Sequence, residues 1–330
     1  MRVALTELRR VARTALLHYG YNDEESETIL DVLLYAQLRG NNQGIAKLIG
    51  RGMPKDPAAG QISIEKETKL SALINGNKNP GMVVLKKATQ IALDKAQEHG
   101  FGIAGTFNTH TSTGAIGYYA RKLAERGFIG FVFAGSPASV CTYGSYERVF
   151  GTNPIAVGLP SETDPVVLDM ATAAMAWYGL VEAKAAGKPI PDHTAYDSQG
   201  HLTTDPAEAM EGAVLPFDRS YKGAGLSMII EMLTGPLVTA SFVGIGDARG
   251  NWGNLVFAID PELLTDGQAF KKNVSKLVER VQSTKKLPGV KEILVPGERG
   301  DKLTRQRLGV GEMEIEDNLY MELKKVIGEK

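Results

Sequence analysis

One histidine stands in the stretch GTFNTHTSTGAIGYYA, Gly105 to Ala120, among side chains that only form hydrogen bonds. The stretch leaves a predicted strand and becomes a predicted helix, with His110 at the junction. Ligands of α/β proteins bind at the carboxyl ends of strands, and a helix N-terminus attracts anions. An imidazole there can donate a proton to a developing alkoxide or remove one from an alcohol. His110 is therefore a candidate acid–base group; the alternative is a helix-capping junction where it makes a structural hydrogen bond.

The sequence contains no convincing dinucleotide-binding glycine motif, metal-ligand spacing or reactive cysteine. Residues 244–250 approach a dinucleotide-binding glycine pattern, but Arg249 takes the third glycine position and a predicted strand follows where a helix belongs. The five histidines show no metal-ligand spacing, so we expect no metal site. Cys141 has no histidine nearby in the sequence, and we expect a buried apolar thiol.

The composition narrows the class of partner. Lys and Arg number 37 against 38 Asp and Glu, so no net charge would attract nucleic acid or an anionic membrane. The single cysteine excludes an internal disulfide and fits a reducing cytosol. The N-terminal segment is charged throughout, unlike a secretory signal, and no apolar run could span a bilayer. We expect a soluble cytoplasmic protein with a small-molecule or protein partner.

The spacing of apolar residues predicts alternating helices and strands. Asn22 and Glu25 are placed as a capping box before a helix. Helical spacing covers 5–17, 29–38, 83–98, 115–124, 224–238 (expected to be buried), 273–278 and 319–326. Strands are expected at 62–64, 70–74, 102–107, 128–134, 155–159, 166–170 and 255–259. Helices that alternate with apolar strands from Gly81 onward indicate a layered α/β core.

Four segments carry a resemblance to a known family. They are YGSYERVFGTNPIAVGLPS (143–161), PVVLDMATAAMAWYGLVEAKAAGKPIP (165–191), LPFDRSYKGAGLSMIIEML (215–233) and LVPGERG (294–300). In this order they resemble the type-2 malate/L-lactate dehydrogenase family, which includes ureidoglycolate, sulfolactate and diketogulonate dehydrogenases and cyclic-imine reductases. The resemblance covers nearly the whole chain. It implies an NAD(P)-dependent oxidoreductase of 2-hydroxy acids, with a cyclic-imine (ketimine) reductase as the alternative.

The resemblance also implies an architecture. The fold would be α/β, with a non-Rossmann mixed-sheet core and with helical N- and C-terminal segments packed together. Residues 1–75 with 284–330 would form a mainly helical substrate and dimer region, and 76–283 the central α/β cofactor-binding region. The family implies a homodimer whose cofactor, NAD or NADP, is held by scattered loops. No residue that distinguishes the two cofactors can be placed.

Eight residues match cofactor-contacting positions of the family: Asp169, Met170, Ala171, Thr172, Tyr221, Lys222, Gly297 and Glu298. We expect Ser136, after a predicted strand, and Asn153, in GTNP, to line the same cofactor cleft with polar groups. A strand that ends in a carboxylate and a hydroxyl can bind ribose hydroxyls or the nicotinamide amide. A lysine supplies charge for phosphate, and a glycine lets the backbone approach closely. Taken singly, Asp169 could instead cap the next helix, and Lys222 could be a solvated surface charge.

The sequence departs from the family at the substrate turn. Asn42-Gln43-Gly44 replaces the usual Ser-His-Gly, and Lys47 replaces an arginine. Glutamine donates hydrogen bonds but exchanges no proton near neutral pH, and lysine lacks the bidentate fork of arginine. We assign Gln43 to hydrogen-bonding the substrate and Lys47 to pairing with its carboxylate. The alternative is a loop at a helix end whose polar groups face water.

The histidine also departs from the family. A gapless alignment puts Ser112 where the family has its histidine. We assign the acid–base role to His110, because no other residue nearby can exchange a proton at neutral pH. We expect Asp169 either to orient that imidazole or to bind the nicotinamide side. The replacements leave open a non-catalytic descendant that only binds a nucleotide.

Overall fold

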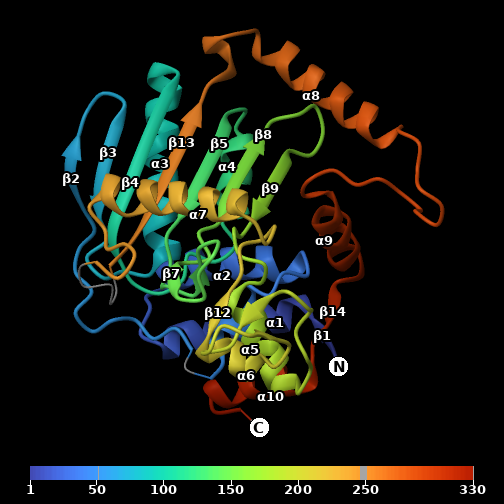
Figure 1. Cartoon of the computed structure of the whole chain (residues 1–330). Coiled ribbons are helices and arrows are strands. Elements are labelled where there is room, and N and C mark those ends of the chain that lie inside the picture. The colour runs from blue at the N-terminus through green and yellow to red at the C-terminus, as the bar shows by residue number, and fades with distance from the viewer. Residues whose placement is uncertain (51, 246–250, 330) are drawn as a thin grey trace.

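A seven-stranded mixed sheet lies at the centre of the computed structural model, which describes residues 1–50, 52–245 and 251–329 (Figure 1). In spatial order its strands are β2 (Ser63–Glu67), β3 (Ser71–Asn75), β4 (Phe101–Thr109), β13 (Trp252–Ile259), β5 (Ile129–Ala134), β8 (Ile155–Leu159) and β9 (Val166–Met170). Only β3 and β4 run parallel; the other neighbours are antiparallel. A Rossmann fold requires a parallel sheet, so the predicted non-Rossmann mixed core is confirmed.

Strand β13 inserts between β4 and β5, which precede it by more than a hundred residues. Leu255 pairs with Gly105 on one side and with Phe133 on the other. This strand was expected after the rejected glycine pattern and is confirmed. Residues 246–250 of that pattern lie outside the described residues.

Helices cover both faces of this sheet (Figure 1). One face packs against α3 (Gly81–His99) and α4 (Gly117–Glu125), and the other against α7 (Tyr221–Thr234) and the short 3-10 helix η2 (Pro236–Val238). The expectation of a wholly buried helix at 224–238 is wrong. Met228, Ile229 and Met232 are 47%, 53% and 45% exposed, because only one side of α7 faces the sheet.

The two ends of the chain pack together, as predicted. The N-terminal elements are β1 (Arg2–Ala4), α1 (Leu5–His18), α2 (Asp23–Leu38) and the 3-10 helix η1 (Ile45–Leu48). The C-terminal elements are α9 (Glu298–Val310), β14 (Glu312–Glu314) and α10 (Asp317–Val326). Strand β1 pairs with β14, α1 contacts α10, and α2 contacts α9. The capping box of Asn22 and Glu25 is present at the start of α2.

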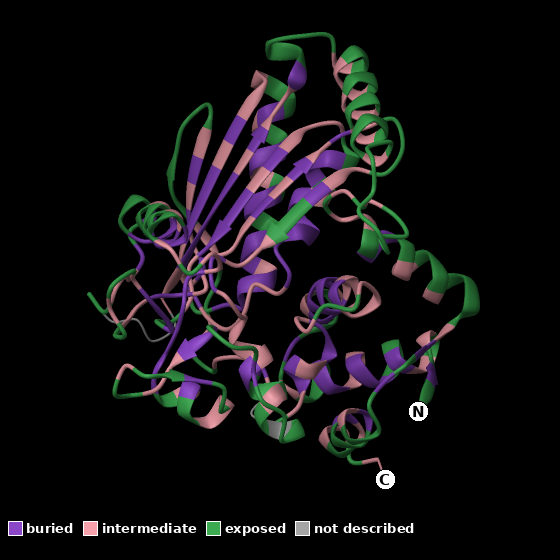
Figure 2. Ribbon diagram, turned by 45° about the vertical axis from the view of Figure 1, so that its right-hand side comes forward, coloured by how far each residue is buried: buried purple, intermediate pink, exposed green. Residues whose placement is uncertain are grey.

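A second, smaller sheet carries the remaining short strands. In order these are β11 (Leu202–Thr203), β10 (Ala195–Tyr196), β12 (Ala213–Val214), β6 (Val140–Cys141) and β7 (Arg148–Phe150), accompanied by α5 (Trp177–Ala186) and α6 (Pro206–Glu211). Cys141 is buried here as predicted, and burial raises the pKa of its thiol to about 11. After the 3-10 helix η3 (Pro261–Leu263), α8 (Gly267–Gln282) projects from the body with no buried residue (Figure 2). Every helix in the described part of the chain is too short or too polar to cross a bilayer.

Gly102 sets how closely α3 can approach the sheet. A Cβ atom at this position would lie 1.9 Å from the backbone oxygen of Ala92, which cannot move independently of its helix. We therefore expect Gly102→Ala to lower the free energy of unfolding by about 3 kcal/mol, measured by urea denaturation. Gly309→Ala is the control, since no atom lies within 4 Å of its Cβ position in α9 and a helix favours alanine. Equal stability of the two variants would contradict this account of the packing.

Candidate functional site

The predicted carboxylate, Asp169, is the second-last residue of β9. Its Oδ2 accepts a hydrogen bond of 2.9 Å from the backbone N–H of Gly117 at the start of α4. The residue is solvent-accessible. A ligand can therefore reach this carboxylate. Desolvation by the surrounding protein raises the pKa of its carboxyl to about 6, although the hydrogen bond from Gly117 and the positive charge of Arg39 both lower that pKa. Asp169 does not cap the next helix, whose N-cap is Ala176.

Three of the predicted segments meet behind this carboxylate. Thr172, two residues beyond β9, donates its hydroxyl hydrogen to the backbone oxygen of Asn153, 3.0 Å away. Ser227 of α7 donates to the Thr172 hydroxyl at 2.9 Å. The Asn153 side-chain amide donates to Glu231 Oε2, also on α7, at 2.6 Å. The GTNP, LDMAT and YKG segments are thus joined by one buried hydrogen-bond network, and Met170 and Ala171 directly precede its member Thr172.

One buried acceptor in this network has no partner. Asn153 is fully buried, and its Oδ1 accepts no hydrogen bond from the described residues. An unmet buried acceptor costs about 1–3 kcal/mol, which an N–H from a ligand would offset. The Ser136 hydroxyl lies close by and accepts a 2.9 Å hydrogen bond from the backbone of the GTNP segment. This unmet acceptor and the accessible Asp169 carboxylate fit the amide and hydroxyl groups of a nicotinamide nucleotide.

The start of α7 presents the predicted Tyr221 and Lys222 to solvent. Tyr221 is 66% exposed, and Lys222 is exposed without an ion pair among the described residues. Ser220 caps the helix by accepting a 3.1 Å hydrogen bond from the backbone N–H of Lys222. The lysine ammonium is therefore free to meet a phosphate, as the prediction requires.

The predicted turn at Gly297 and Glu298 lies beside β9 and begins α9. Gly297 has φ +89°, and its carbonyl oxygen accepts a 2.7 Å hydrogen bond from Arg39 of the segment after α2. The Glu298 carboxylate is already occupied by Gln282 at 2.9 Å and Lys302 at 3.0 Å. The backbone of this turn thus lies beside β9. The Glu298 side chain instead bonds to residues of its own segment and of α8.

The turn after α2 is partly buried, with Asn41 exposed and Gly44 buried. Gln43 Nε2 donates to Asn42 Oδ1 at 3.2 Å, and both side chains are half-buried. Lys47, in η1, is only 2% exposed. Its ammonium nitrogen lies 3.7 Å from the centre of the Tyr178 ring in the first turn of α5. The alternative of a loop whose polar groups face water is therefore wrong for Lys47, the residue predicted to pair with the substrate carboxylate.

His110 directly follows β4, as predicted. Its backbone N–H donates to Asn79 at 2.9 Å, and its carbonyl accepts from Gly81 at 2.8 Å. Within the described residues its half-buried imidazole has no hydrogen-bond partner, which disfavours the structural-bond alternative. Asp169 does not orient this ring, because its carboxylate is directed to Gly117.

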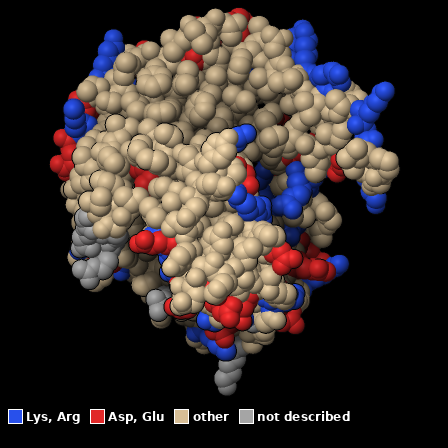
Figure 3. Space-filling model, in the orientation of Figure 1, with Lys and Arg blue, Asp and Glu red and all other residues tan. Residues whose placement is uncertain are grey.

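Two features near the site were not foreseen from the sequence. Tyr178 stands in the quoted AWYG motif, but nothing there signals a contact with Lys47. Asp301 of α9 pairs with Arg39 at 2.5 Å and with Arg121 at 2.6 Å, joining three distant segments. Figure 3 shows a hollow on the right of this face where Lys and Arg side chains gather, a setting that favours an anionic ligand.

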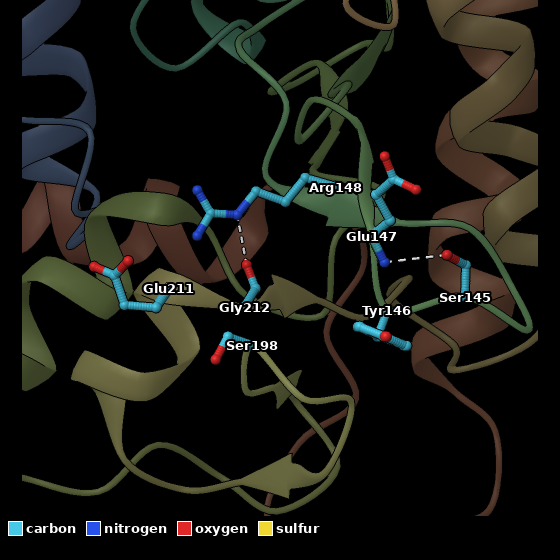
Figure 4. A pocket seen from close by; sticks show the side chains of 7 residues that line it. All are labelled: Ser145, Tyr146, Glu147, Arg148, Ser198, Glu211 and Gly212. Atoms are coloured by element: carbon cyan, nitrogen blue, oxygen red, sulfur yellow. Dashed lines mark hydrogen bonds between the residues drawn. The ribbon is translucent and has the colours of Figure 1, made fainter.

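A surface groove lies near the start of α5, where the guanidinium of its lining residue Arg148 is 5.6 Å from the centre of the Trp177 ring. Its volume is about 640 Å³, and it lies beside the smaller sheet (Figure 4). Its lining consists of Ser145, Tyr146, Glu147, Arg148, Ser198, Glu211 and Gly212. Arg148 Nε donates to the Gly212 carbonyl oxygen at 2.5 Å, and its Nη2 donates to the Met210 carbonyl oxygen. No group of three or more metal-ligating side chains occurs in the described ranges.

Comparison with known proteins places the whole chain in one family. The family model described as malate/L-lactate dehydrogenase matches residues 3–324. The chain is 36% identical to the malate/(S)-sulfolactate dehydrogenase of Methanothermus fervidus, over 94% of this chain and 92% of that protein. It is 29% identical to the Δ1-pyrroline-2-carboxylate/Δ1-piperideine-2-carboxylate reductase of Pseudomonas putida, over 93% and 95% of the two chains.

The fold agrees with these matches. The solved structure of sulfolactate dehydrogenase from Methanocaldococcus jannaschii superposes with a TM-score of 0.83 and 32% identity. The match covers 100% of this chain and 98% of that one. The mixed sheet and the packed terminal segments are therefore shared with a protein whose name describes a hydroxy-acid dehydrogenase.

Proposed function

The chain belongs to the malate/L-lactate dehydrogenase family, and on that premise we propose that it is an NAD(P)-dependent oxidoreductase of small 2-hydroxy and 2-oxo acids. The observation that carries the proposal is the segment 169–178. At one end Asp169 and Thr172 adjoin the Asn153 network, and at the other Tyr178 covers Lys47. The groups expected to hold a nucleotide and those expected to hold a carboxylate thus lie on one short segment.

The roles proposed for the residues follow from their chemistry. A bound nicotinamide cofactor, NAD or NADP, would supply or accept the hydride. Asn153, Asp169 and Thr172 would bind it, together with Ser136, Met170, Ala171, Tyr221, Lys222, Gly297 and Glu298. His110 would donate the proton to the carbonyl oxygen during reduction. Gln43 would hydrogen-bond the substrate, and Lys47 would pair with its carboxylate.

We further propose a cytoplasmic homodimer, in which 76–283 binds the cofactor and 1–75 with 284–330 forms the substrate and dimer region. Two unpartnered apolar surfaces support the dimer. One is the outward face of α7, with Met228, Ile229 and Met232, and the other is α8, where Leu277 is 64% exposed. Exposed apolar faces of this kind favour association. Sedimentation of the purified protein tests it, and a monomer at micromolar concentration would contradict it.

The function is tested by following the absorbance of NADH and NADPH against 2-oxo acids, including dicarboxylic and sulfonated ones, and against cyclic imines. We expect oxidation of the cofactor with at least one 2-oxo acid. Gln43→His should raise turnover, by up to about a hundredfold, because it restores a proton-exchanging group to the substrate turn. Gln61→His, at an exposed position, is the matched control.

The other outcomes separate the alternatives. Activity confined to cyclic imines would assign the chain to imine reduction, as the name of the Pseudomonas putida relative describes for that protein. Binding of the nucleotide without turnover of any compound would favour a non-catalytic protein.

A further inference from the structure

The amino group of Lys47 is buried and has no acidic partner among the described residues. Two half-buried lysines have acidic partners: Lys55 pairs with Glu25 at 2.7 Å and Lys95 with Glu67 at 2.9 Å. Lys47 is more buried than either, at 2% exposure, and makes no ion pair or hydrogen bond through its ammonium group with any described residue. Burying a charge is costly unless it is paired, so this group lacks the partner that such a position demands.

The surroundings of Lys47 favour an anion as that partner. Its ammonium lies over the ring of Tyr178, the second residue of α5. The N-cap of α5 is Ala176, whose side chain cannot satisfy the free backbone N–H groups of the first turn. An unpaired cation and an uncapped helix N-terminus meet at this point, and both attract negative charge.

Resting on the proposed function, we propose that Lys47 and the first turn of α5 bind the carboxylate of the substrate, and that Lys47 takes up a proton from solution as the substrate enters. The ammonium form then pairs with the carboxylate against the Tyr178 ring. The affinity for substrate, and not the chemical step, thereby becomes dependent on pH. Arginine, which stays charged at any working pH, would bind the same carboxylate without a proton.

The electrostatics of the free site support proton uptake. Burial lowers the pKa of Lys47 to about 7. Tyr178 of α5 lies against the Lys47 ammonium, and Tyr19 at the end of α1 donates to the backbone oxygen of the next residue, Leu48. Burial raises the pKa of both tyrosines, so both stay neutral. From α2, the neutral Gln37 side chain accepts a 3.1 Å hydrogen bond from the backbone N–H of Ile45, two residues before Lys47. Further along α5, the charge that acts on Glu182 is Glu316 and not Lys47.

The direction of the pH dependence follows. Below pH 7 the free lysine already carries its proton, so binding takes up none. Above pH 7 the free amine is neutral, and each binding event must bring a proton. The apparent affinity then falls about tenfold per pH unit well above pH 7. We expect KM for the 2-oxo acid to rise about tenfold from pH 6 to pH 8 in the wild type, with a much smaller change in Lys47→Arg.

Kinetics and calorimetry test this together. KM and kcat are measured from pH 6 to 9 at saturating reduced cofactor for the wild type, Lys47→Arg and Lys47→Met. Proton uptake is measured by titrating the matching 2-hydroxy acid into the complex with reduced cofactor, which cannot react, in phosphate and in Tris. We expect uptake approaching one proton at pH 8 in the wild type and none in Lys47→Arg. Lys95→Met, which removes a lysine whose partner is known, should behave as the wild type.

Three results would overturn the proposal. They are a wild-type KM that does not change with pH, a Lys47→Arg profile that follows the wild type, and an unchanged KM in Lys47→Met. Nucleotide binding by each variant, followed by fluorescence, shows that it is folded. If the enzyme turns over a substrate but its KM does not change with pH, only the Lys47 proposal is overturned. If no compound is turned over, both the proposed function and the Lys47 proposal are overturned.

Discussion

Replacing His110 with alanine is expected to lower kcat for reduction of the 2-oxo acid by about 10²- to 10⁴-fold, the usual contribution of a positioned acid. The imidazole is half-buried at the end of β4 and has no hydrogen-bond partner among the described residues. Its backbone bonds to Asn79 and Gly81 do not depend on the side chain. The variant should therefore fold normally and lose only the proton donor.

The measurement is steady-state reduction of the substrate identified in the turnover panel, over a range of pH. His201→Ala is the matched control, since that ring is 78% exposed and bonds only to Asp197. A primary isotope effect with deuterated cofactor should stay the same or shrink in His110→Ala if proton transfer has become limiting. Unchanged kcat in His110→Ala would refute the assignment of His110 as the proton donor.

Replacing Asp301 with alanine is expected to reduce the free energy of unfolding by about 3–5 kcal/mol. The Asp301 carboxylate is 7% exposed and pairs with both Arg39 and Arg121, which are 11% and 16% exposed. Its loss leaves two guanidinium groups in a largely buried position without their shared anion. Arg39 also holds the Gly297 carbonyl, so the start of α9 should loosen as well.

Urea denaturation of the purified variant measures this effect. Asp164→Ala is the control: Asp164 also pairs with Arg121, at 3.4 Å, but is 49% exposed. An exposed pair of this kind contributes about 1 kcal/mol or less. A similar loss in both variants would mean that burial of the Asp301 pairs is not what makes them important.

Local patterns were sufficient for much of the secondary structure. The capping box of Asn22 and Glu25 begins α2 as expected, because a cap depends on residues three apart in sequence. Strands β8 and β9 were predicted with their observed bounds from their apolar runs. The helix at α7 was expected from residue 224 but begins at Tyr221, because Ser220 caps it.

Other elements depended on distant contacts. Helix α5 follows a motif read only for its cofactor contacts, and it was not predicted. Helix α9 begins at Glu298 after Gly297, where only a turn was expected. The apolar composition of α7 could not reveal which of its sides the sheet would cover. Burial of Ile230 and exposure of Met228 and Ile229 are decided by the sheet and not by the helix itself.

By itself the sequence determined the family, the alternation of helices and strands, and the residue types available to hold a nucleotide and a carboxylate. These depend on the order of residues along the chain. The tertiary structure alone decided that Lys47 is sealed against Tyr178 without an acid, and that Asp301 joins Arg39 across 262 residues of sequence. Burial and charge pairing are properties of neighbours in space. The free energy of a charge depends on how much water and how many opposite charges those neighbours leave around it.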